Sequence, residues 1–129
     1  MEKEIYYYTL ASEQRNPIAQ NNLGSIYQHG EGVPVDYEKG LHYYKLAAEG
    51  GSASAYSNIG FMYGNGLGVT QSYETAFQYF KVAADKGVDV AQINVGGYYY
   101  NGHGVEKDIS LAIKYLTLSA DQGDEKSRK

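Results

Sequence analysis

The sequence repeats itself at intervals of 36 residues, and the copies align without any gap. The clearest marker is a Gly-x-Gly-Val motif that begins at Gly30, Gly66 and Gly102. A period of roughly 20 to 50 residues is typical of stacked supersecondary units, none of which buries its apolar face alone. Other positions also keep one residue in all three copies: Ala19, Ala55 and Ala91; Asn22, Asn58 and Asn94; Gly24, Gly60 and Gly96; Tyr27, Tyr63 and Tyr99; Tyr43, Tyr79 and Tyr115. The chain is therefore predicted to be an array whose core is divided among its units.

The register of the repeat also divides the chain. Tyr7 lies one period before Tyr43, so the first residues match the second half of a unit. We expect a single domain with a partial repeat at 1–16, repeats at 17–52, 53–88 and 89–123, and a polar tail at 124–129.

Each unit holds two apolar stretches with helical spacing, separated by the Gly-x-Gly-Val loop. In the first unit, Ala19, Leu23 and Ile26 follow one another at intervals of three or four residues. Candidate N-caps precede the second helices at Asp36, Ser72 and Asp108. Glycines suited to a left-handed helix end follow those helices at Gly51, Gly87 and Gly123. The predicted fold class is all-α, built from antiparallel helix pairs.

One glycine lies inside the first helix of each unit, and the three are Gly24, Gly60 and Gly96. Glycine costs about 1 kcal/mol relative to alanine in a helix interior, so its recurrence implies a structural reason. We expect close helix-to-helix approach at these positions, with a neighbouring tyrosine packed over the gap.

The loop Asn-Gly-Leu-Gly-Val at residues 65–69 looks at first like a phosphate-binding turn. A phosphate loop would follow a strand, precede a helix and carry a lysine or an acidic ribose partner. This loop follows a predicted helix, occurs three times and lacks the Gly-Lys-Ser/Thr ending. It is therefore predicted only to turn the chain between two helices.

The combined pattern resembles a known repeat. The first unit reads Ala-x2-Asn-x-Gly-x2-Tyr-x2-Gly-x-Gly-Val, then Asp-x3-Gly-x2-Tyr-Tyr-x2-Ala-Ala-x2-Gly, which is similar to the Sel-one-like repeat (SLR), a relative of the tetratricopeptide repeat. The resemblance covers residues 1–123, with departures at Ser119 and at Thr70-Gln71-Ser72. It implies an α/α solenoid of about three and a half helix pairs in a right-handed superhelix. It also implies an adaptor that holds other proteins together, and many such proteins are bacterial.

The composition argues against several kinds of partner and site. The net charge is −4, and Lys and Arg form no cluster of the kind that binds nucleic acid or an anionic membrane. The absence of cysteine excludes disulfides, thiolate metal sites and a Cys nucleophile. No apolar run approaches the roughly 20 residues of a membrane span, and the first residues show no signal-peptide pattern. The compartment stays open between the cytoplasm and, if a leader has been removed, an exported location.

The sequence predicts no enzyme, no cofactor and no metal site. The three histidines, His29, His42 and His103, lack the i, i+4 spacing of a zinc-binding helix and are expected to face solvent. Glu31 and Asp36 are not reproduced as an acid/base pair by the other units, and the serines lack a nucleophile-elbow setting.

The predicted binding surface is the concave side of the stack, which the first helices line. Its repeated members are Asn22, Asn58 and Asn94, whose amides can pair with a peptide backbone or can instead bridge neighbouring helices. Its variable members, where specificity can reside, are Asn21, Ser25 and Gln28; Ser57 and Phe61; and Ile93, Gly97 and Tyr100. Phe61 and Tyr100 are the predicted aromatic anchors.

The predicted function is a protein–protein interaction scaffold for a protein or peptide partner. The alternative is a small-ligand or cell-wall-fragment binder, or a weak hydrolase, with a pocket near Phe61 and Tyr100. At the ends of the array, partly uncovered apolar residues are expected at Ile5 and Tyr8 and among Leu111, Tyr115 and Leu118. Such ends suit either a piece of a longer array or end-to-end self-association.

A peptide with an acidic C-terminus is predicted not to bind. The carboxylate clamp of tetratricopeptide repeats needs Lys or Arg on the inner helix, whereas the equivalent turns here carry His29, Asn65 and Asn101. Without fixed cations, charge-assisted hydrogen bonds are lost. Fluorescence anisotropy with such a peptide checks this, and a micromolar dissociation constant would refute it.

Overall fold

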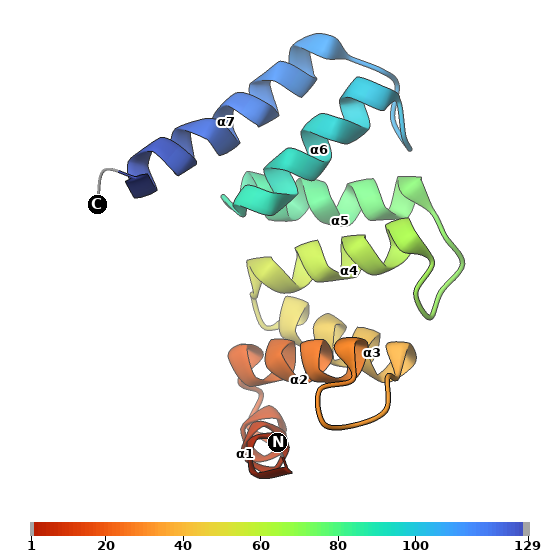
Figure 1. The fold of residues 1–129 in the computed structure, drawn as a ribbon, viewed down its shortest axis with the longest axis vertical. Helices are drawn as coiled ribbons and strands as arrows, with labels where there is room; N and C mark the ends of the chain where they lie inside the picture. Colours follow the sequence, from red (N-terminus) through yellow and green to blue (C-terminus); the bar gives the residue numbers. More distant parts are fainter. Residues whose placement is uncertain (1, 128–129) are drawn as a thin grey trace.

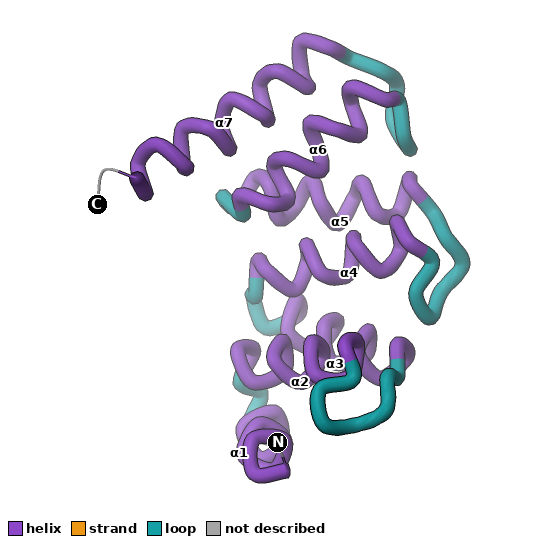
Figure 2. The backbone as a smooth tube through the Cα atoms, in the orientation of Figure 1, coloured by secondary structure: helices purple, strands orange, loops and turns teal. Residues whose placement is uncertain are grey.

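The computed structural model describes residues 2–127, with side chains placed for residues 3–123. The described chain folds into seven helices and no strand (Figures 1 and 2). They are α1 (Glu2–Glu13), α2 (Pro17–His29), α3 (Tyr37–Glu49), α4 (Ala53–Asn65), α5 (Tyr73–Asp85), α6 (Asp89–Asn101) and α7 (Ile109–Ser127).

The helices stack in chain order, from α1 at one end to α7 at the other (Figure 1). The pairs α2 and α3, α4 and α5, and α6 and α7 are joined by long loops at one edge, and short turns join successive pairs at the opposite edge (Figure 2). The major packing contacts are between helices that are consecutive in the chain. This arrangement confirms the predicted all-α repeat solenoid.

Helix starts follow the predicted capping chemistry. The Asn16 side chain accepts hydrogen bonds from the N–H groups of Ile18 and Ala19, and Pro17 is the first helical residue of α2. The predicted caps of the second helices each accept from the N–H three residues later, and they are Asp36, Ser72 and Asp108. These bonds satisfy N–H groups that have no partner inside the helix.

The predicted stop at Gly123 is wrong, because α7 continues through it to Ser127. Residues 124–127 are therefore helical rather than part of a separate tail. Gly51 and Gly87 adopt φ values of 100° and 92°, and in both places the chain folds back into the helix of the next unit. At Gly123 no described helix follows to pack against α7, so nothing favours the left-handed turn over another helical turn.

The glycines inside the first helices lie where two helices touch. A Cβ atom on Gly24 would stand 2.5 Å from Tyr44 Cδ1 and 3.0 Å from the carbonyl oxygen of Gly40. The equivalent atoms on Gly60 and Gly96 would stand 2.9 Å from Phe80 and 2.8 Å from Leu116. The predicted close approach is thus confirmed, although the covering residue is a tyrosine only in the first unit.

The second glycine of each later loop joins neighbouring units. Gly68 has a φ of 73°, and a Cβ atom there would lie 2.8 Å from Tyr37 Cβ at the start of α3 in the preceding unit. Gly104 lies in the same way against the backbone of Tyr73, where a Cβ atom would come within 2.5 Å. The loop is therefore a helix-to-helix turn that also contacts the unit before it.

The core is divided along the stack, as the repeat requires. One buried cluster joins Leu41, Tyr44 and Ala47 of α3 to Ile59 and Met62 of α4. A second cluster joins α5 to α6 and includes Tyr115 of α7. Beside them, one tyrosine pair per unit stacks with ring centroids 5.9, 5.8 and 6.0 Å apart: Tyr27 and Tyr43, Tyr63 and Tyr79, and Tyr99 and Tyr115.

The two ends expose apolar side chains, partly at the predicted positions. Ile5 and Tyr8 of α1 are half-buried, whereas Tyr6 and Tyr7 are 59% and 64% exposed. In α7, Leu118 is exposed and Leu111 half-buried, as expected, while Tyr115 is buried against Tyr99.

Gly24→Ala is expected to destabilise the protein, and Gly97→Ala to stabilise it. The Gly24 methyl group would overlap the Tyr44 ring, and overpacking of this kind costs about 1–3 kcal/mol. Gly97 lies in α6 with nothing within 4 Å of the added atom, so alanine gains about 0.5–1 kcal/mol of helix propensity. Chemical denaturation of the two variants measures this, and equal shifts would contradict the close-contact interpretation.

Candidate functional site

Helices α2, α4 and α6 each turn one face to solvent. The face comprises residues at intervals i, i+4, i+7 and i+11, which lie along one side of a helix. We call it the first-helix face, and its members are Ile18, Asn22, Ser25 and His29; Ser54, Asn58, Phe61 and Asn65; and Val90, Asn94, Gly97 and Asn101. All twelve are exposed or half-buried, whereas Leu23, Ile59 and Val95 on the opposite side are fully buried.

The repeated asparagines of this face do not all have the same surroundings. Asn58 Nδ2 of α4 donates to Asn21 Oδ1 of α2 over 2.9 Å, so this pair bridges two neighbouring first helices. Asn22 and Asn94 are half-buried. A structural role is therefore visible for Asn58 and Asn21, and a binding role for Asn22 and Asn94 remains a prediction.

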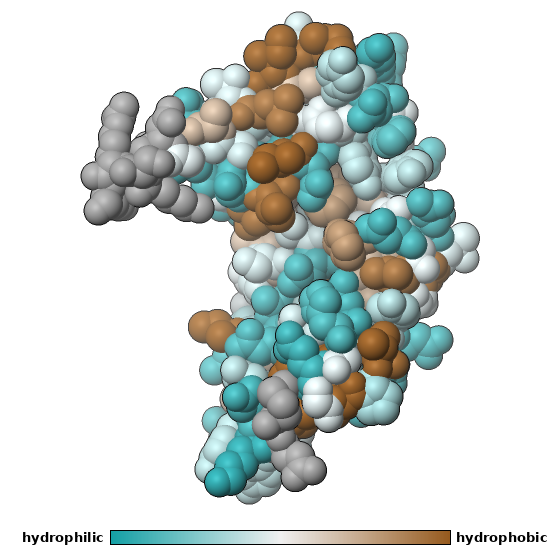
Figure 3. All heavy atoms as spheres, viewed as in Figure 1, coloured by the Kyte–Doolittle hydropathy of each residue, from teal (hydrophilic) through white to brown (hydrophobic). Residues whose placement is uncertain are grey.

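Large apolar side chains are exposed on α4 and α6. Phe61 is 46% exposed, Ile93 47% and Tyr100 57%. Ile93 and Tyr100 flank the first-helix face of α6. On the side of the molecule shown in Figure 3, apolar surface gathers mainly over α6 and α7. The three predicted residues are thus available for contact.

Two of the predicted contact residues are buried, which corrects that part of the prediction. Gln28 is 8% exposed and its Oε1 accepts a 2.6 Å hydrogen bond from the Tyr44 hydroxyl group, while Ser57 is 5% exposed. Both lie at the border of the first-helix face, where neighbouring helices cover them. Ser25 stays half-buried at the surface, with its hydroxyl 3.3 Å from His29 Nδ1.

The pKa of Tyr44 is raised to about 12, mainly by burial; the Ser25 hydroxyl group acts to lower this pKa, and the Glu31 carboxylate acts to raise it. Desolvation disfavours the charged phenolate, so Tyr44 stays a neutral donor to Gln28. The pair belongs to the core between α2 and α3 rather than to the surface.

The sequence-based prediction did not include two exposed apolar residues of the first-helix face. Ile18 is 74% exposed and Val90 is 56% exposed. They occupy the same repeat position, one helical turn before Asn22 and Asn94. Extending the stripe by one turn towards the helix start would have found them.

His29, Asn65 and Asn101 occupy the same repeat position at the end of the first helices, and each side chain contacts the carbonyl oxygen of the residue four positions earlier. Asn65 and Asn101 donate to the carbonyl oxygens of Phe61 and Gly97 over 2.9 and 3.0 Å, and His29 Nδ1 lies 2.9 Å from the Ser25 carbonyl oxygen. In the third unit the aromatic ring of His103 stacks on Tyr73, with centroids 4.5 Å apart, so His103 is only half-exposed.

A small acidic groove lies at the α1 end of the first-helix face. Its volume is about 110 Å³, and it is lined by Glu4, Tyr8 and Glu31 together with Asn22, Ser25 and Ile26. The two carboxylates give this end of the surface a negative potential, which favours a cationic group.

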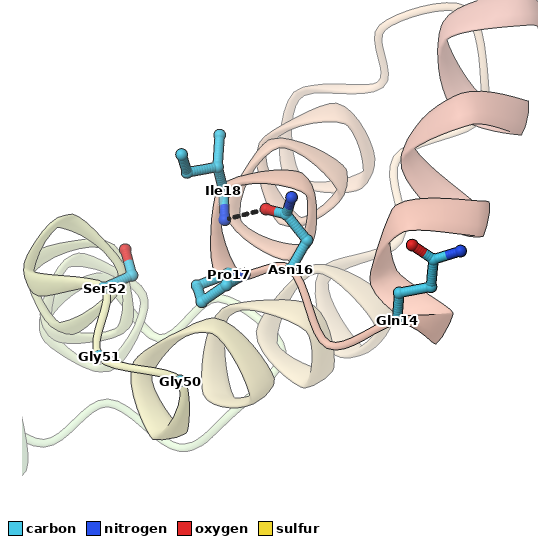
Figure 4. A pocket seen from close by; sticks show the side chains of 7 residues that line it. All are labelled: Gln14, Asn16, Pro17, Ile18, Gly50, Gly51 and Ser52. Carbon is cyan, nitrogen blue, oxygen red and sulfur yellow. Dashed lines mark hydrogen bonds between the residues drawn. The ribbon is translucent and has the colours of Figure 1, made fainter.

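A wider groove runs between the α1–α2 and α3–α4 turns (Figure 4). Its volume is about 540 Å³, but its polar groups already cap helices, since Asn16 accepts from the Ile18 N–H and Ser52 from the Ala55 N–H. Neither Phe61 nor Tyr100 lines this groove, the acidic groove or three further grooves on the described surface. These grooves therefore give no support to the predicted small-ligand pocket near Phe61 and Tyr100.

Within the described residues, no three His, Cys, Asp or Glu side chains gather as a metal-binding group. None of the described helices is long and apolar enough to cross a membrane.

The comparison with protein families accounts for this geometry. The model of the Sel1 repeat matches three consecutive segments, residues 17–52, 53–88 and 89–124. The chain belongs to the Sel1 repeat family. Sel1 repeats are the Sel-one-like repeats that the sequence pattern predicted, and these solenoids are generally protein-interaction scaffolds and generally not enzymes.

Solved structures share the Sel1 repeat fold. A protective antigen of uropathogenic Escherichia coli strains that displays an SLR fold is 32% identical, with a TM-score of 0.88 over 92% of this chain and 26% of that protein. A Sel1 repeat protein from Oxalobacter formigenes is 34% identical, with a TM-score of 0.85 over 92% of this chain and 49% of that one. Helicobacter pylori cysteine rich protein B is 26% identical, with a TM-score of 0.74 over 95% and 87% of the two chains. No curated protein matches. This Sel1 repeat chain thus spans about a quarter and about half of the first two relatives.

The raised pKa of Tyr44 predicts a loss of stability at high pH. The folded-state pKa of about 12 exceeds the ordinary value of 10, so the stabilisation is full below pH 10 and falls as pH rises towards 12. Tyr44→Phe should flatten this fall, which denaturation at several pH values measures. At neutral pH it should cost about 1–3 kcal/mol, since Gln28 loses its donor. An unchanged high-pH decline would contradict the assignment, and Tyr6→Phe is the exposed control.

Proposed function

We propose that this Sel1 repeat chain is a scaffold that binds an extended segment of a partner protein along the first-helix face of α2, α4 and α6. The observation that carries the proposal is the exposure of Phe61, Ile93 and Tyr100 on an otherwise repetitive surface. The general role of Sel1 repeats in protein interaction supports it.

The side chains at the positions of Phe61 and Tyr100 are not repeated between units. The position of Phe61 holds Ser25 in the first unit and Gly97 in the third, and the position of Tyr100 holds Gln28 and Gly64. A residue required for contact between units would recur in each of them. Exposed aromatic side chains without such a role are suited to a partner, because large rigid side chains dominate the energy of interfaces.

The surface also suggests the chemistry of the segment. Near α1, Glu4 and Glu31 line the small groove beside Asn22, which suits a lysine or arginine side chain. Towards α6, the surface is apolar. The half-buried Asn94 offers two amide donors and an acceptor to the backbone of the segment. The proposed partner is therefore an extended peptide with a basic residue at the α1 end and apolar residues at the α6 end.

The small-ligand and hydrolase alternative has less support. The grooves described above do not include the predicted pocket at Phe61 and Tyr100, and the relatives that share the fold are solenoids. The scaffold function is therefore the one that the exposed residues favour.

Peptides selected from a random display library against the wild-type protein test the proposal. Binding measured by fluorescence anisotropy should weaken by about tenfold or more in Phe61→Asp and in Tyr100→Asp, because each removes about 1.5–3 kcal/mol of apolar burial. Thermal melts should change little, because both side chains are largely exposed.

Val82→Asp is the matched control, since Val82 is a 38% exposed apolar residue on α5, outside the first-helix face. Glu31→Lys should weaken binding of selected peptides that contain a basic residue. Peptides whose affinity depends on Val82 and is indifferent to Phe61 and Tyr100 would refute the proposed surface.

A further inference from the structure

Position 56 departs from the repeat in a way that changes the packing beside it. The equivalent residues of the neighbouring units are Gln20 and Gln92, and both are buried, at 4% exposed. Each glutamine side chain donates to a carbonyl oxygen of the preceding helix, that of Ser12 over 3.4 Å or that of Ala84 over 3.2 Å. The Tyr56 side chain has no amide for such a bond and is half-buried. The junction between α3 and α4 is therefore packed differently from the equivalent junctions on either side.

A groove with a volume of about 230 Å³ lies beside Tyr56, among α3, α4 and α5. Two tyrosine rings line it, with centroids 6.2 Å apart, next to the buried side chains of an alanine and an isoleucine. A lysine and a glutamate of α3, one helical turn apart, complete the lining. The groove thus combines an apolar and aromatic surface with one ammonium and one carboxylate group. Its lining residues are Lys45, Ala48, Glu49, Tyr56, Ile59 and Tyr79.

The equivalent place in the next unit is closed by its own side chains. Lys81 Nζ and Asp85 Oδ2 form an ion pair of 2.7 Å. The Tyr115 hydroxyl group donates to the other oxygen of the same carboxylate over 3.1 Å. These three residues lie one period after the lysine, the glutamate and the second tyrosine of the groove. The repeat therefore shows a carboxylate held between a lysine and a tyrosine hydroxyl group at this position.

The corresponding groups of the groove are not joined in this way. Lys45 Nζ donates a long hydrogen bond of 3.5 Å to the Tyr63 hydroxyl group. The structure describes both Lys45 and Glu49 and records no ion pair between them. A ligand carboxylate can therefore take the place beside Lys45 and Tyr79 that the aspartate takes in the next unit. The Glu49 carboxylate, one turn away, suits a cationic group of the same ligand.

We propose that this groove binds a free α-amino acid with an apolar or aromatic side chain. The ligand carboxylate pairs with Lys45 and the Tyr79 hydroxyl group, and the ligand ammonium group pairs with Glu49. The ligand side chain lies against the Tyr56 ring and Ile59. One cation and one anion in the lining match a zwitterion, whereas Glu49 repels a simple anion and Lys45 a simple cation. The volume is smaller than the roughly 300–1,000 Å³ of pockets for drug-sized ligands, which suits a ligand of amino-acid size.

The groove is separate from the surface proposed for the partner segment. Tyr56 lies two residues before Asn58 of the first-helix face, about 200° around the helix, so it lies on the opposite side of α4. The charged residues and the second tyrosine of the groove belong to the second helices α3 and α5. The groove also differs from the small-ligand pocket predicted near Phe61 and Tyr100. The site therefore does not rest on the proposed scaffold function.

Titration of the wild-type protein with L-phenylalanine, followed by calorimetry and by amide NMR shifts, tests the proposal. Saturable binding is expected. N-acetyl-L-phenylalanine lacks the ammonium group and L-phenylalanine amide lacks the carboxylate, so each should bind at least about tenfold more weakly. Glycine lacks the apolar side chain and should also bind at least about tenfold more weakly.

Tyr56→Gln is the most informative variant, because the neighbouring units carry and bury glutamine at this position. Its thermal melt should show a folded protein, and its affinity for L-phenylalanine should fall by about tenfold or more. Lys45→Gln and Glu49→Gln change exposed side chains and should each weaken binding by a similar factor. The matched controls are Lys39→Gln and Glu38→Gln on the same helix, outside the groove, and both should leave the affinity unchanged.

The proposal is overturned if L-phenylalanine shows no saturable binding, or if the N-acetyl or amide derivative binds equally well. Unchanged affinity in any of the three groove variants also overturns it. Tighter binding of the dipeptide Gly-L-Phe than of L-phenylalanine has the same consequence, because the end of a peptide chain would then be the ligand.

Discussion

The close approach of helices at small residues is the contact on which the rest of the structure depends. At Gly24 the backbone of α2 lies against Gly40 of α3, and Tyr44 fills the space above the glycine. The same contact recurs at Gly60 and Gly96, with Phe80 and Leu116 as the covering residues. Because helices pack mainly on their neighbours in the chain, the geometry of one unit sets that of the next. The second loop glycines, Gly68 and Gly104, add a contact to the preceding unit that a side chain would block.

This architecture leaves two kinds of surface free for other molecules. The outer face of each first helix takes no part in the glycine contacts, so its residues can differ between units without disturbing the stack, as Ser25, Phe61 and Gly97 do. The last described helix, α7, also exposes apolar side chains, among them Ile113 at 59%.

Much of the fold could be predicted because its signals are local. Asp36 and Ser72 cap helices through atoms three residues away, and the Gly-x-Gly-Val loop turns the chain wherever it occurs. The candidate site was less predictable. Gln28 and Ser57 have the spacing of surface residues, yet Gln28 is held by Tyr44, sixteen positions later in the chain. Ile18 and Val90 were missed because they lie one turn before the repeated asparagines, and α7 continued through Gly123 because glycine permits a turn without requiring it.

The sequence by itself determined the period, the helix pairs, the loop glycines and the family, since each depends on residues that recur at fixed spacing. Only the tertiary structure decided which side chains at the border of a helix face are covered, because coverage depends on the neighbouring helix. The same holds for the repeated asparagines, of which Asn58 is engaged with Asn21 on the adjacent helix. It also holds for α7, where Ile113 is 59% exposed although Leu41, at the same repeat position of α3, is 7% exposed. The repeat determines which residues each unit contains, but the burial of a side chain depends on the neighbouring helices that cover it.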